Sequence, residues 1–187
     1  MMMMNKKQKT HDDSNKKRGA IDLYAAQCSK CQKWRTIETK EEYEQLRSKF
    51  MEEPFTCDMK PNVSCDDLPD LDYDATRTWV IDKPNLPITP EGFKRELILR
   101  PDYSKLDAHY ITPDGKKVRC HAEVSQYLQR HPEFNNLKLE NFNFTVPKIM
   151  EDTIPEDARK KRLEKSASKN RKVDSGGPDG KRKTTKN

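Results

Sequence analysis

The sequence has 187 residues, of which 36% are charged and 32% hydrophobic, and its mean hydropathy is -1.13. A chain this polar cannot bury one large core, and no apolar run in it approaches the length of a membrane span. The composition therefore argues against a transmembrane protein and predicts two compact modules with polar, partly unfolded flanks.

The net charge of +6 hides an uneven distribution along the chain. Residues 1–20 carry a net charge of +4 and residues 158–187 carry +9, whereas residues 21–76 carry -6 and residues 77–157 carry -1. Basic ends bind polyanions such as nucleic acids without sequence preference, and an acidic module attracts basic peptides. We therefore predict disordered basic tails over residues 1–20 and 151–187.

The opening segment MMMMNKKQK lacks the apolar core of a signal peptide, so we expect no secretion. Short basic clusters occur near the other end, namely KKR at 160–162, NRK at 170–172 and KRK at 181–183. Such clusters act as nuclear localisation signals or simply as a solvated tail, and the two roles are compatible. We predict a nuclear protein in a reducing compartment, where disulfides are rare.

The first four of the five cysteines are Cys28, Cys31, Cys57 and Cys65, with the spacing C-x2-C, a gap of twenty-five residues, then C-x7-C. A tetrahedral zinc ion takes four soft ligands, and a two-residue gap lets one tight turn present two thiolates to it. A redox motif would need a surrounding βαβ pattern, which this sequence lacks. We predict one structural Zn2+ ion; redox chemistry and unrelated buried thiols are the alternatives.

Between the two cysteine pairs, residues 39–50 have the pattern of a short helix. Thr39 and Glu42 form a capping-box pair, and Tyr43, Leu46 and Phe50 share one face. We expect this apolar stripe to pack against the zinc core, because so small a module cannot stabilise itself without metal.

Residues 21–70 resemble the CW-type zinc finger. The matching residues are Gln27-Cys28, Cys31, Lys33-Trp34-Arg35, Phe55-Thr56-Cys57 and Cys65. The resemblance implies a small zinc-stapled fold, and several members of that family hold a methylated lysine of a histone tail between two tryptophans. Aromatic faces attract a quaternary ammonium group by cation–π interaction.

Trp34 matches one wall of that cage, and Ala25 stands where the other tryptophan falls, beside Tyr24. The expected histone-peptide residues are therefore Trp34 and Tyr24. The alternative is that Trp34 belongs to the core and that the module is a zinc-stapled interaction surface.

Residues 66–92 are acidic at first and then interrupted by prolines, which exclude a long helix. The aspartates of this stretch lack the glycine turn and terminal glutamate of a calcium-binding loop, so we predict a solvated acidic linker. Trp79, Val80 and Ile81 are expected to form a strand or an anchor onto one module.

The following residues predict a small sheet and a helix. Residues 94–100 and 108–112 are typical of strands, and the PDGK turn at 113–116 leads into a return strand at 117–120. Residues 120–130 are typical of a helix. Its Val124, Tyr127 and Leu128 share one face.

Residues 77–150 resemble the methyl-CpG-binding domain family. The matching residues include Pro90, Gly92, Arg95, Arg100, Leu106-Asp107, Ile111, Pro113, Gly115-Lys116, Arg119 and Glu123, with a similar closing segment at 141–147. The family uses two arginines on the two guanines of a CpG step, because an arginine fork donates two hydrogen bonds to guanine O6 and N7. The resemblance assigns this role to Arg100, held by Asp107, and to Arg119, held by Glu123.

The expected DNA-binding residues are Arg100, Asp107, His109, Lys116, Lys117, Arg119 and Glu123. Lys94, Arg95, Lys105, Lys116 and Lys117 would contact phosphates, which position the protein without specifying a sequence. The alternative is that these charges form a solvated sheet face.

Departures from the family pattern weaken methyl selectivity. His109 stands where methyl-selective members have tyrosine, the loop after Arg100 is short, and Cys120 replaces a helix-capping serine. We expect DNA binding with weak or no preference for methyl-CpG.

Together these observations predict an α+β chain. Its domains are a basic tail over 1–20, a CW-type zinc finger with an acidic linker over 21–76, a methyl-CpG-binding-like domain over 77–150 and a basic tail over 151–187. The predicted function is a nuclear chromatin-associated adaptor that binds DNA and, through the zinc module, a histone tail or another chromatin protein.

Two alternatives stay open, namely a protein–protein scaffold that no longer binds DNA and a true methyl-CpG reader in transcriptional regulation. We expect no catalysis, no small-molecule substrate and no membrane partner, because neither a phosphate-binding glycine loop nor a nucleophile elbow is present.

Overall fold

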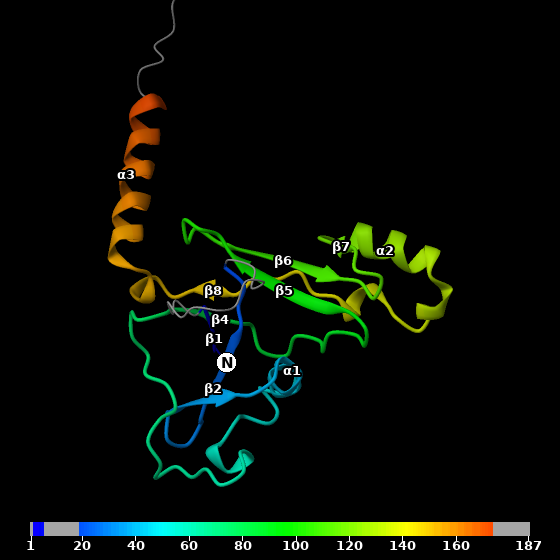
Figure 1. Cartoon of the computed structure of the whole chain (residues 1–187), viewed down its shortest axis with the longest axis horizontal. Coiled ribbons are helices and arrows are strands. Elements are labelled where there is room, and N and C mark those ends of the chain that lie inside the picture. Colours follow the sequence, from blue (N-terminus) through cyan, green and yellow to red (C-terminus); the bar gives the residue numbers. More distant parts are fainter. Residues whose placement is uncertain (1, 6–18, 174–187) are drawn as a thin grey trace, which may run out of the picture. The chain divides into compact units, whose positions relative to one another are not determined.

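The computed structural model describes residues 2–5 and 19–173. The chain divides after Pro155 into two compact units. The first unit contains two antiparallel sheets and two α-helices, and the second contains the helix α3 (Glu156–Val173) (Figure 1). No helix in the described ranges is both long enough and apolar enough to cross a membrane.

The larger sheet draws its strands from the whole length of the first unit. Its spatial order is β3-β2-β1-β4-β8, and every neighbouring pair is antiparallel. The strands are β1 (Met2–Asn5), β2 (Leu23–Gln27), β3 (Trp34–Ile37), β4 (Thr78–Ile81) and β8 (Lys148–Ile149). The predicted strand at Trp79–Ile81 is confirmed, and it joins the zinc-finger strands to the C-terminal part of the unit.

The smaller sheet is the meander predicted for the second module. Its strands are β5 (Lys94–Leu99), β6 (Leu106–Ile111) and β7 (Lys117–Val118) in that order. The PDGK turn is confirmed: Gly115 has φ of 84° and donates its amide to the Thr112 carbonyl at 2.9 Å. A left-handed φ favours glycine there, which explains the residue choice.

Both predicted helices of the first unit are present. Helix α1 (Lys40–Ser48) begins at the N-cap Thr39, whose hydroxyl accepts the Glu42 amide at 3.1 Å. Helix α2 (His121–Arg130) follows Cys120, whose side chain makes no capping hydrogen bond. Four short 3-10 turns complete the unit, namely η1 (Cys57–Met59), η2 (Pro132–Phe134), η3 (Leu139–Asn141) and η4 (Glu151–Thr153).

One hydrophobic cluster crosses the boundary between the two expected modules. Ile21, Tyr43 and Phe55 of the zinc-finger region pack in it together with Leu97 and Leu106 of the smaller sheet. Burial of such side chains stabilises by about 1.5–3 kcal/mol each, so the modules share part of their folding energy. A second cluster, between the smaller sheet and α2, contains Phe93, Tyr110, Val124, Tyr127 and Phe142.

A buried ion-pair network lies on the same boundary. The carboxylate of Asp82 binds Arg47 of α1 at 2.9 Å and Arg95 of β5 at 3.3 Å, and all three side chains are almost fully buried. Arg95 also donates to the Thr145 carbonyl at 2.7 Å. The expectation that Arg95 contacts phosphate is therefore wrong, because its guanidinium points into the protein.

The predicted disordered tails differ from the structure at three places. Glu151–Thr153 form η4, and Thr153 and Ile154 are buried. Met2–Asn5 form β1, because a strand between two sheet edges gains main-chain hydrogen bonds that composition does not reveal. Glu156–Val173 form α3, which begins with two acidic residues and an ion pair of Glu156 with Lys160 at 2.9 Å. The predicted disorder at 6–18 and 174–187 lies outside the described residues.

Candidate zinc centre and nucleic-acid interface

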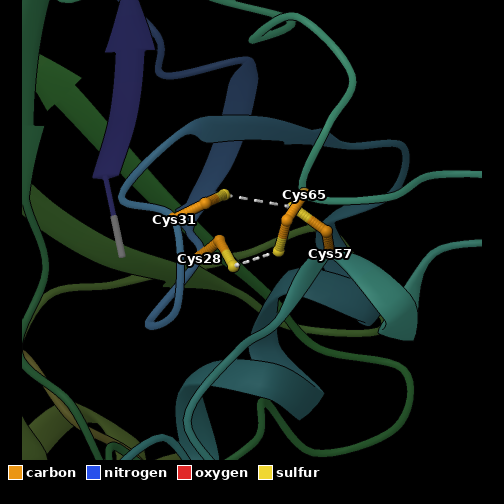
Figure 2. A group of neighbouring side chains, drawn as sticks. All are labelled: Cys28, Cys31, Cys57 and Cys65. Carbon is orange, nitrogen blue, oxygen red and sulfur yellow. Dashed lines mark hydrogen bonds between the residues drawn. The ribbon is translucent and has the colours of Figure 1, made fainter.

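The four predicted metal ligands come together at one point. Cys28 directly follows β2, Cys31 lies in the turn after it, Cys57 opens η1 and Cys65 lies in the following loop. Their sulfur atoms all lie within 4.8 Å of one another, and they point toward a common centre (Figure 2).

The sulfur–sulfur distances fit a zinc ion. The Cys28 and Cys65 sulfurs are 3.8 Å apart and those of Cys31 and Cys57 are 3.6 Å apart. A tetrahedron with zinc–sulfur bonds of about 2.3 Å has edges of about 3.8 Å. These distances exclude disulfides, whose sulfurs lie about 2.05 Å apart. All four cysteines are free.

A tight turn prepares Cys28 as a thiolate. The Cys28 carbonyl accepts the Gln32 amide at 2.9 Å, and Gln32 takes the left-handed φ of 62° that closes the turn. Burial acts to raise the pKa of the Cys28 thiol, but backbone hydrogen bonds around Cys31 outweigh it and lower that pKa to about 6. Burial raises the pKa of Cys57. The turn thus favours the deprotonated form that metal binding needs.

Arg35 fixes the loop that carries the fourth ligand. Its guanidinium is 1% exposed; it donates to the Cys57 sulfur at 3.3 Å, to the Ser64 carbonyl at 2.9 Å and to Asp70 at 3.1 Å. Lys33 adds a bond to the Cys65 carbonyl at 2.7 Å. Arg35 belongs to the motif Lys33-Trp34-Arg35 that carries the family resemblance, but its structural role was not predicted from the sequence.

Part of the predicted acidic linker belongs to this support. Asp70 accepts hydrogen bonds from Thr36 and Lys60 in addition to Arg35, and these partners lower the pKa of its carboxyl against the opposing effect of burial. Asp70 is therefore a structural residue although its side chain is 27% exposed, whereas Asp66 and Asp72 are exposed positions that fit the expected solvated linker.

The structure does not bring the two expected histone-peptide residues together. In the β2–β3 pairing Gln27 lies opposite Trp34 and Tyr24 lies opposite Ile37, so Tyr24 and Trp34 project from opposite faces of the sheet. Tyr24 instead packs against Tyr43, with ring centroids 5.0 Å apart and the ring planes tilted by 36°. The proposal that Tyr24 substitutes for the second cage wall is therefore wrong.

Trp34 has a different aromatic neighbour. Its ring lies 5.2 Å from that of Trp79, which packs beside the small residue Ala25 and is fully buried. The ring centroid of Tyr73 also lies 5.2 Å from that of Trp79, and the Tyr73 hydroxyl donates to the Asp152 carboxylate at 2.9 Å. Trp79 of β4 thus supplies an aromatic side chain where the zinc finger itself has alanine.

The first predicted DNA-reading arginine is held as expected. Arg100 donates from Nε and Nη2 to the two carboxylate oxygens of Asp107, at 2.9 and 2.8 Å. These hydrogen bonds lower the pKa of the Asp107 carboxyl, and both side chains are about half exposed. The pair orients a rigid donor fork that still has hydrogens on Nη1 and Nη2 for an outside acceptor.

The second arginine is held differently. Glu123 accepts the backbone amide of Arg119 at 2.6 Å, and no ion pair between their side chains occurs in the described part of the chain. The expectation that Glu123 orients the Arg119 guanidinium is therefore wrong; the carboxylate closes the start of α2 instead. A carboxylate at a helix N-terminus is stabilised by the free amides there, which explains the choice.

His109 does not present a donor to the solvent. It is 5% exposed, and its Nε2 lies 2.7 Å from Glu96 Oε2, directly across the β5–β6 pair. Glu96 therefore brings a carboxylate to the face that carries Arg100 and Asp107. The family resemblance could not show this pairing, because it depends on the residue opposite His109 on another strand.

The remaining predicted DNA contacts lie on an exposed rim. Lys116 and Lys117 are exposed in the β6–β7 hairpin, and Lys116 pairs with Asp114 at 2.9 Å. Beside them a hollow of about 620 Å³ is lined by residues that include Lys105, Lys117 and Arg119. On this face of the three-stranded sheet, lysine and arginine side chains therefore lie around the carboxylates of Glu96 and Asp107.

Two family models match this chain. The model described as "CW-type Zinc Finger" matches residues 24–71, and the model described as "Methyl-CpG binding domain" matches residues 79–152. "Methyl-CpG-binding domain-containing protein 4" of Arabidopsis thaliana is 58% identical over 139 residues, which is 74% of this chain and 75% of that protein. The chain belongs to the methyl-CpG-binding domain protein family.

Other members of the methyl-CpG-binding domain protein family from the same plant are also similar. "Methyl-CpG-binding domain-containing protein 1" is 53% identical over 80% of this chain and 74% of its own length, and "Methyl-CpG-binding domain-containing protein 2" is 38% identical over 71% and 52%. No solved structure matches this chain.

The zinc-finger match covers all four sulfur ligands, whose geometry fits the metal. This methyl-CpG-binding domain protein holds one structural zinc ion, which staples the loop of Cys57 and Cys65 to the turn of Cys28 and Cys31. With four thiolates in place, no coordination position remains for a substrate. Both matched modules are binding domains, and together they make this a DNA- or chromatin-binding protein.

Proposed function

We propose that this protein is a nuclear, chromatin-associated DNA-binding adaptor. In this role the three-stranded sheet contacts DNA with weak or no methyl-CpG preference, while the zinc module contacts a histone tail or another chromatin protein. The observation that carries the DNA part is the Arg100–Asp107 pair, a preorganised donor fork on an exposed sheet face. Such forks read guanine O6 and N7 in the major groove.

Phosphate contacts come from the exposed lysines Lys94, Lys105, Lys116 and Lys117. Within the second unit α3 adds a separate basic surface, because eight of its eighteen residues are lysine or arginine and three are acidic. Contacts of this kind give affinity that falls steeply with salt. Arg119 completes the proposed DNA interface as the second base-reading side chain.

Weak methyl selectivity follows from the orientation of His109. Its ring nitrogen is engaged by Glu96, so it is not directed at a base. The Glu96 carboxylate is 28% exposed on the same face, and covering it with an apolar methyl group brings a desolvation cost without a matching gain. A second candidate function is a protein–protein scaffold that no longer binds DNA. The Glu96 carboxylate favours it, because it weakens the positive potential of the sheet face that carries Arg100.

The histone-tail part rests on charge and on Trp34. Residues 21–76 carry a net charge of -6, and Trp34 is only partly buried. An acidic module attracts basic peptides at nuclear salt concentrations. We further propose that the protein is not an enzyme, since both matched family models describe binding domains.

A gel-shift comparison of the full chain tests the DNA part. Matched duplexes with CpG and methyl-CpG should bind with affinities within about ten-fold of each other, and both should weaken steeply between low and physiological salt. A methyl preference well above ten-fold would establish the true methyl-CpG reader instead. A shortened chain that ends at residue 157 and shows no DNA affinity at low salt would establish the scaffold.

A further inference from the structure

A cavity of about 230 Å³ lies between the zinc-finger region and the smaller sheet. Part of its wall is the side of α1 that runs from Lys40 to Arg47, and part is formed by residues 94–97 of β5. Lys94 is exposed, so the cavity is open to solvent. A water molecule takes up about 30 Å³ in the liquid, so the space is large enough for a small organic molecule.

Side chains of this wall carry buried donors that have no acceptor. Tyr43 is 1% exposed, and its hydroxyl makes no hydrogen bond within the described part of the chain. The Nε groups of Arg47 and Arg95 also lack an acceptor there, although the two residues are only 1% and 4% exposed. Burial raises the pKa of Tyr43 well above its usual value, so the hydroxyl keeps the proton that it can donate. Buried donors in proteins are almost always satisfied, so these three groups indicate an acceptor from outside the chain.

The buried charges around the cavity leave an excess of positive charge. One oxygen of Asp82 serves both Arg47, at 2.9 Å, and Arg95, at 3.3 Å, so a single carboxylate faces two cations. Lys40 lies 3.7 Å from Glu44, and these two charges offset each other. The two further charges that line the cavity, a lysine and a glutamate of β5, also cancel. An uncompensated buried charge is costly, and a bound anion would remove that cost.

Another part of the wall is apolar. Ile21 and Leu97 line the cavity and belong to the hydrophobic cluster that the two modules share. Ala20 and Tyr24 extend this apolar surface. An inorganic anion would use only the donors, whereas a molecule with a charged head and a short hydrocarbon body uses both parts of the wall. Carboxylate is the head group that matches arginine donors in charge and geometry.

We propose that this cavity binds a small organic carboxylate. Its head accepts hydrogen bonds from the Tyr43 hydroxyl and from the Nε groups of Arg47 and Arg95, and its hydrocarbon body lies against Ile21 and Leu97. The site goes beyond the proposed function and does not depend on it, because the ligand is a small molecule rather than DNA or a peptide. The carboxylate contacts α1 and β5 at once, so its binding stabilises the folded arrangement of the two modules.

The test titrates the full, zinc-loaded chain with sodium butyrate and follows the NMR signals of the arginine Nε–H groups. We expect saturable shifts of the Arg47 and Arg95 signals, with a dissociation constant on the order of 1 mM for a ligand of this size. The melting temperature should rise with butyrate concentration. Butyramide has the same shape without the charge and should bind at least about ten-fold more weakly. Sodium chloride and sodium phosphate at equal ionic strength are the inorganic controls.

A substitution of one hydroxyl separates ligand contact from folding. Tyr43→Phe keeps the ring and removes a donor that has no partner in the described chain, so the melting temperature without butyrate should not fall. Butyrate affinity should nevertheless fall by about five-fold or more, because one hydrogen bond to the charged head is lost. Tyr73→Phe is the matched control, since that hydroxyl binds Asp152 and does not line the cavity. It should bind butyrate like the unmodified chain.

A second variant serves if Tyr43→Phe loses its zinc. Lys40→Met removes a charge beside the cavity and keeps the aliphatic stem, so butyrate affinity should fall by about three-fold or more. Unchanged Arg47 and Arg95 signals in the unmodified chain overturn the proposal and leave water as the acceptor. Equal binding of butyramide overturns it in favour of a merely apolar cavity, and equal shifts with chloride or phosphate overturn it in favour of an unselective anion site.

Discussion

The zinc centre and the three-stranded sheet differ in how completely the polar groups of their arginines are bonded within the protein. At the zinc centre, Arg35 is 1% exposed and every arm of its guanidinium is bonded to the loops that carry Cys57 and Cys65. On the sheet, Arg100 is oriented by one exposed carboxylate, and Arg119 is linked to its expected partner only through the backbone. The arginine of the zinc centre therefore stabilises the fold, whereas the arginines of the three-stranded sheet keep exposed N–H donors that a partner could accept.

The comparison also separates buried from exposed charge. The Asp82 carboxylate between Arg47 and Arg95 has no exposed side-chain surface, whereas Asp107 is half exposed. Breaking a buried pair leaves an uncompensated charge, while an exposed pair is screened by water and salt. Substitutions of similar chemistry in the two regions should therefore have very different effects on stability.

The largest effect is expected from loss of the metal. Chelation of zinc, or Cys57→Ser, should abolish cooperative unfolding, because a structural zinc site contributes on the order of 10 kcal/mol. The smaller sheet should lose its order too, since Leu97 and Leu106 share a cluster with Phe55. Thermal unfolding followed by near-ultraviolet circular dichroism measures this. Cys120→Ser, at an exposed cysteine outside the cluster, is the matched control: unfolding should stay cooperative, with a gain of about 1 kcal/mol at most from a serine cap on α2.

The next effect is expected at the boundary between the modules. Asp82→Asn should destabilise the protein by about 3–5 kcal/mol, because it leaves Arg47 and Arg95 buried without their carboxylate. Urea unfolding gives the value, and Asp66→Asn at an exposed position is the control. A change below about 1 kcal/mol would show that the two modules are not held together by this network.

A third substitution tests the difference between the two arginines. Arg100→Ala should reduce DNA affinity by about ten-fold or more, and Arg119→Ala should reduce it less, because only the Arg100 fork is held by a carboxylate. Titration of a CpG duplex at fixed salt measures both. Lys30→Ala, in the zinc module, is the control. An equal or larger loss for Arg119→Ala would contradict the asymmetry.

The smallest effect on stability is expected for Asp107→Asn. Its ion pair with Arg100 is about half exposed, so the melting temperature should move by less than about 2 °C. DNA affinity should nevertheless fall, because the fork of Arg100 loses its preferred orientation. A much lower melting temperature of the variant would show that Asp107 stabilises the fold as Asp82 does, and would contradict the contrast between the two.

Local patterns predicted much of this structure. The cysteine spacing identified all four sulfur ligands, Thr39 marked the start of α1, and Gly115 marked the hairpin turn. These features depend on residues close in sequence or on a spacing fixed by metal geometry. The family resemblance added the Arg100–Asp107 pair, which the structure contains.

The features that could not be predicted depend on contacts between distant segments. The basic composition of residues 1–20 hid β1, whose pairing comes from β2 and β4. Tyr24 was chosen as the second cage wall because it is the sequence neighbour of Ala25, but in a strand neighbouring side chains point to opposite faces. The roles of Arg95 and His109 were missed because their partners, Asp82 and Glu96, lie on other strands or segments.

The cluster that joins Ile21 and Phe55 to Leu97 and Leu106 has a consequence for life in the cell. Loss of zinc should impair both modules together, because the module that we propose to bind DNA shares this cluster with the module that holds the metal. A split of the gene near codon 77 would give two fragments with exposed hydrophobic surfaces. We expect cellular proteases to degrade such fragments. Occupancy on chromosomes should therefore rise and fall with intracellular zinc supply.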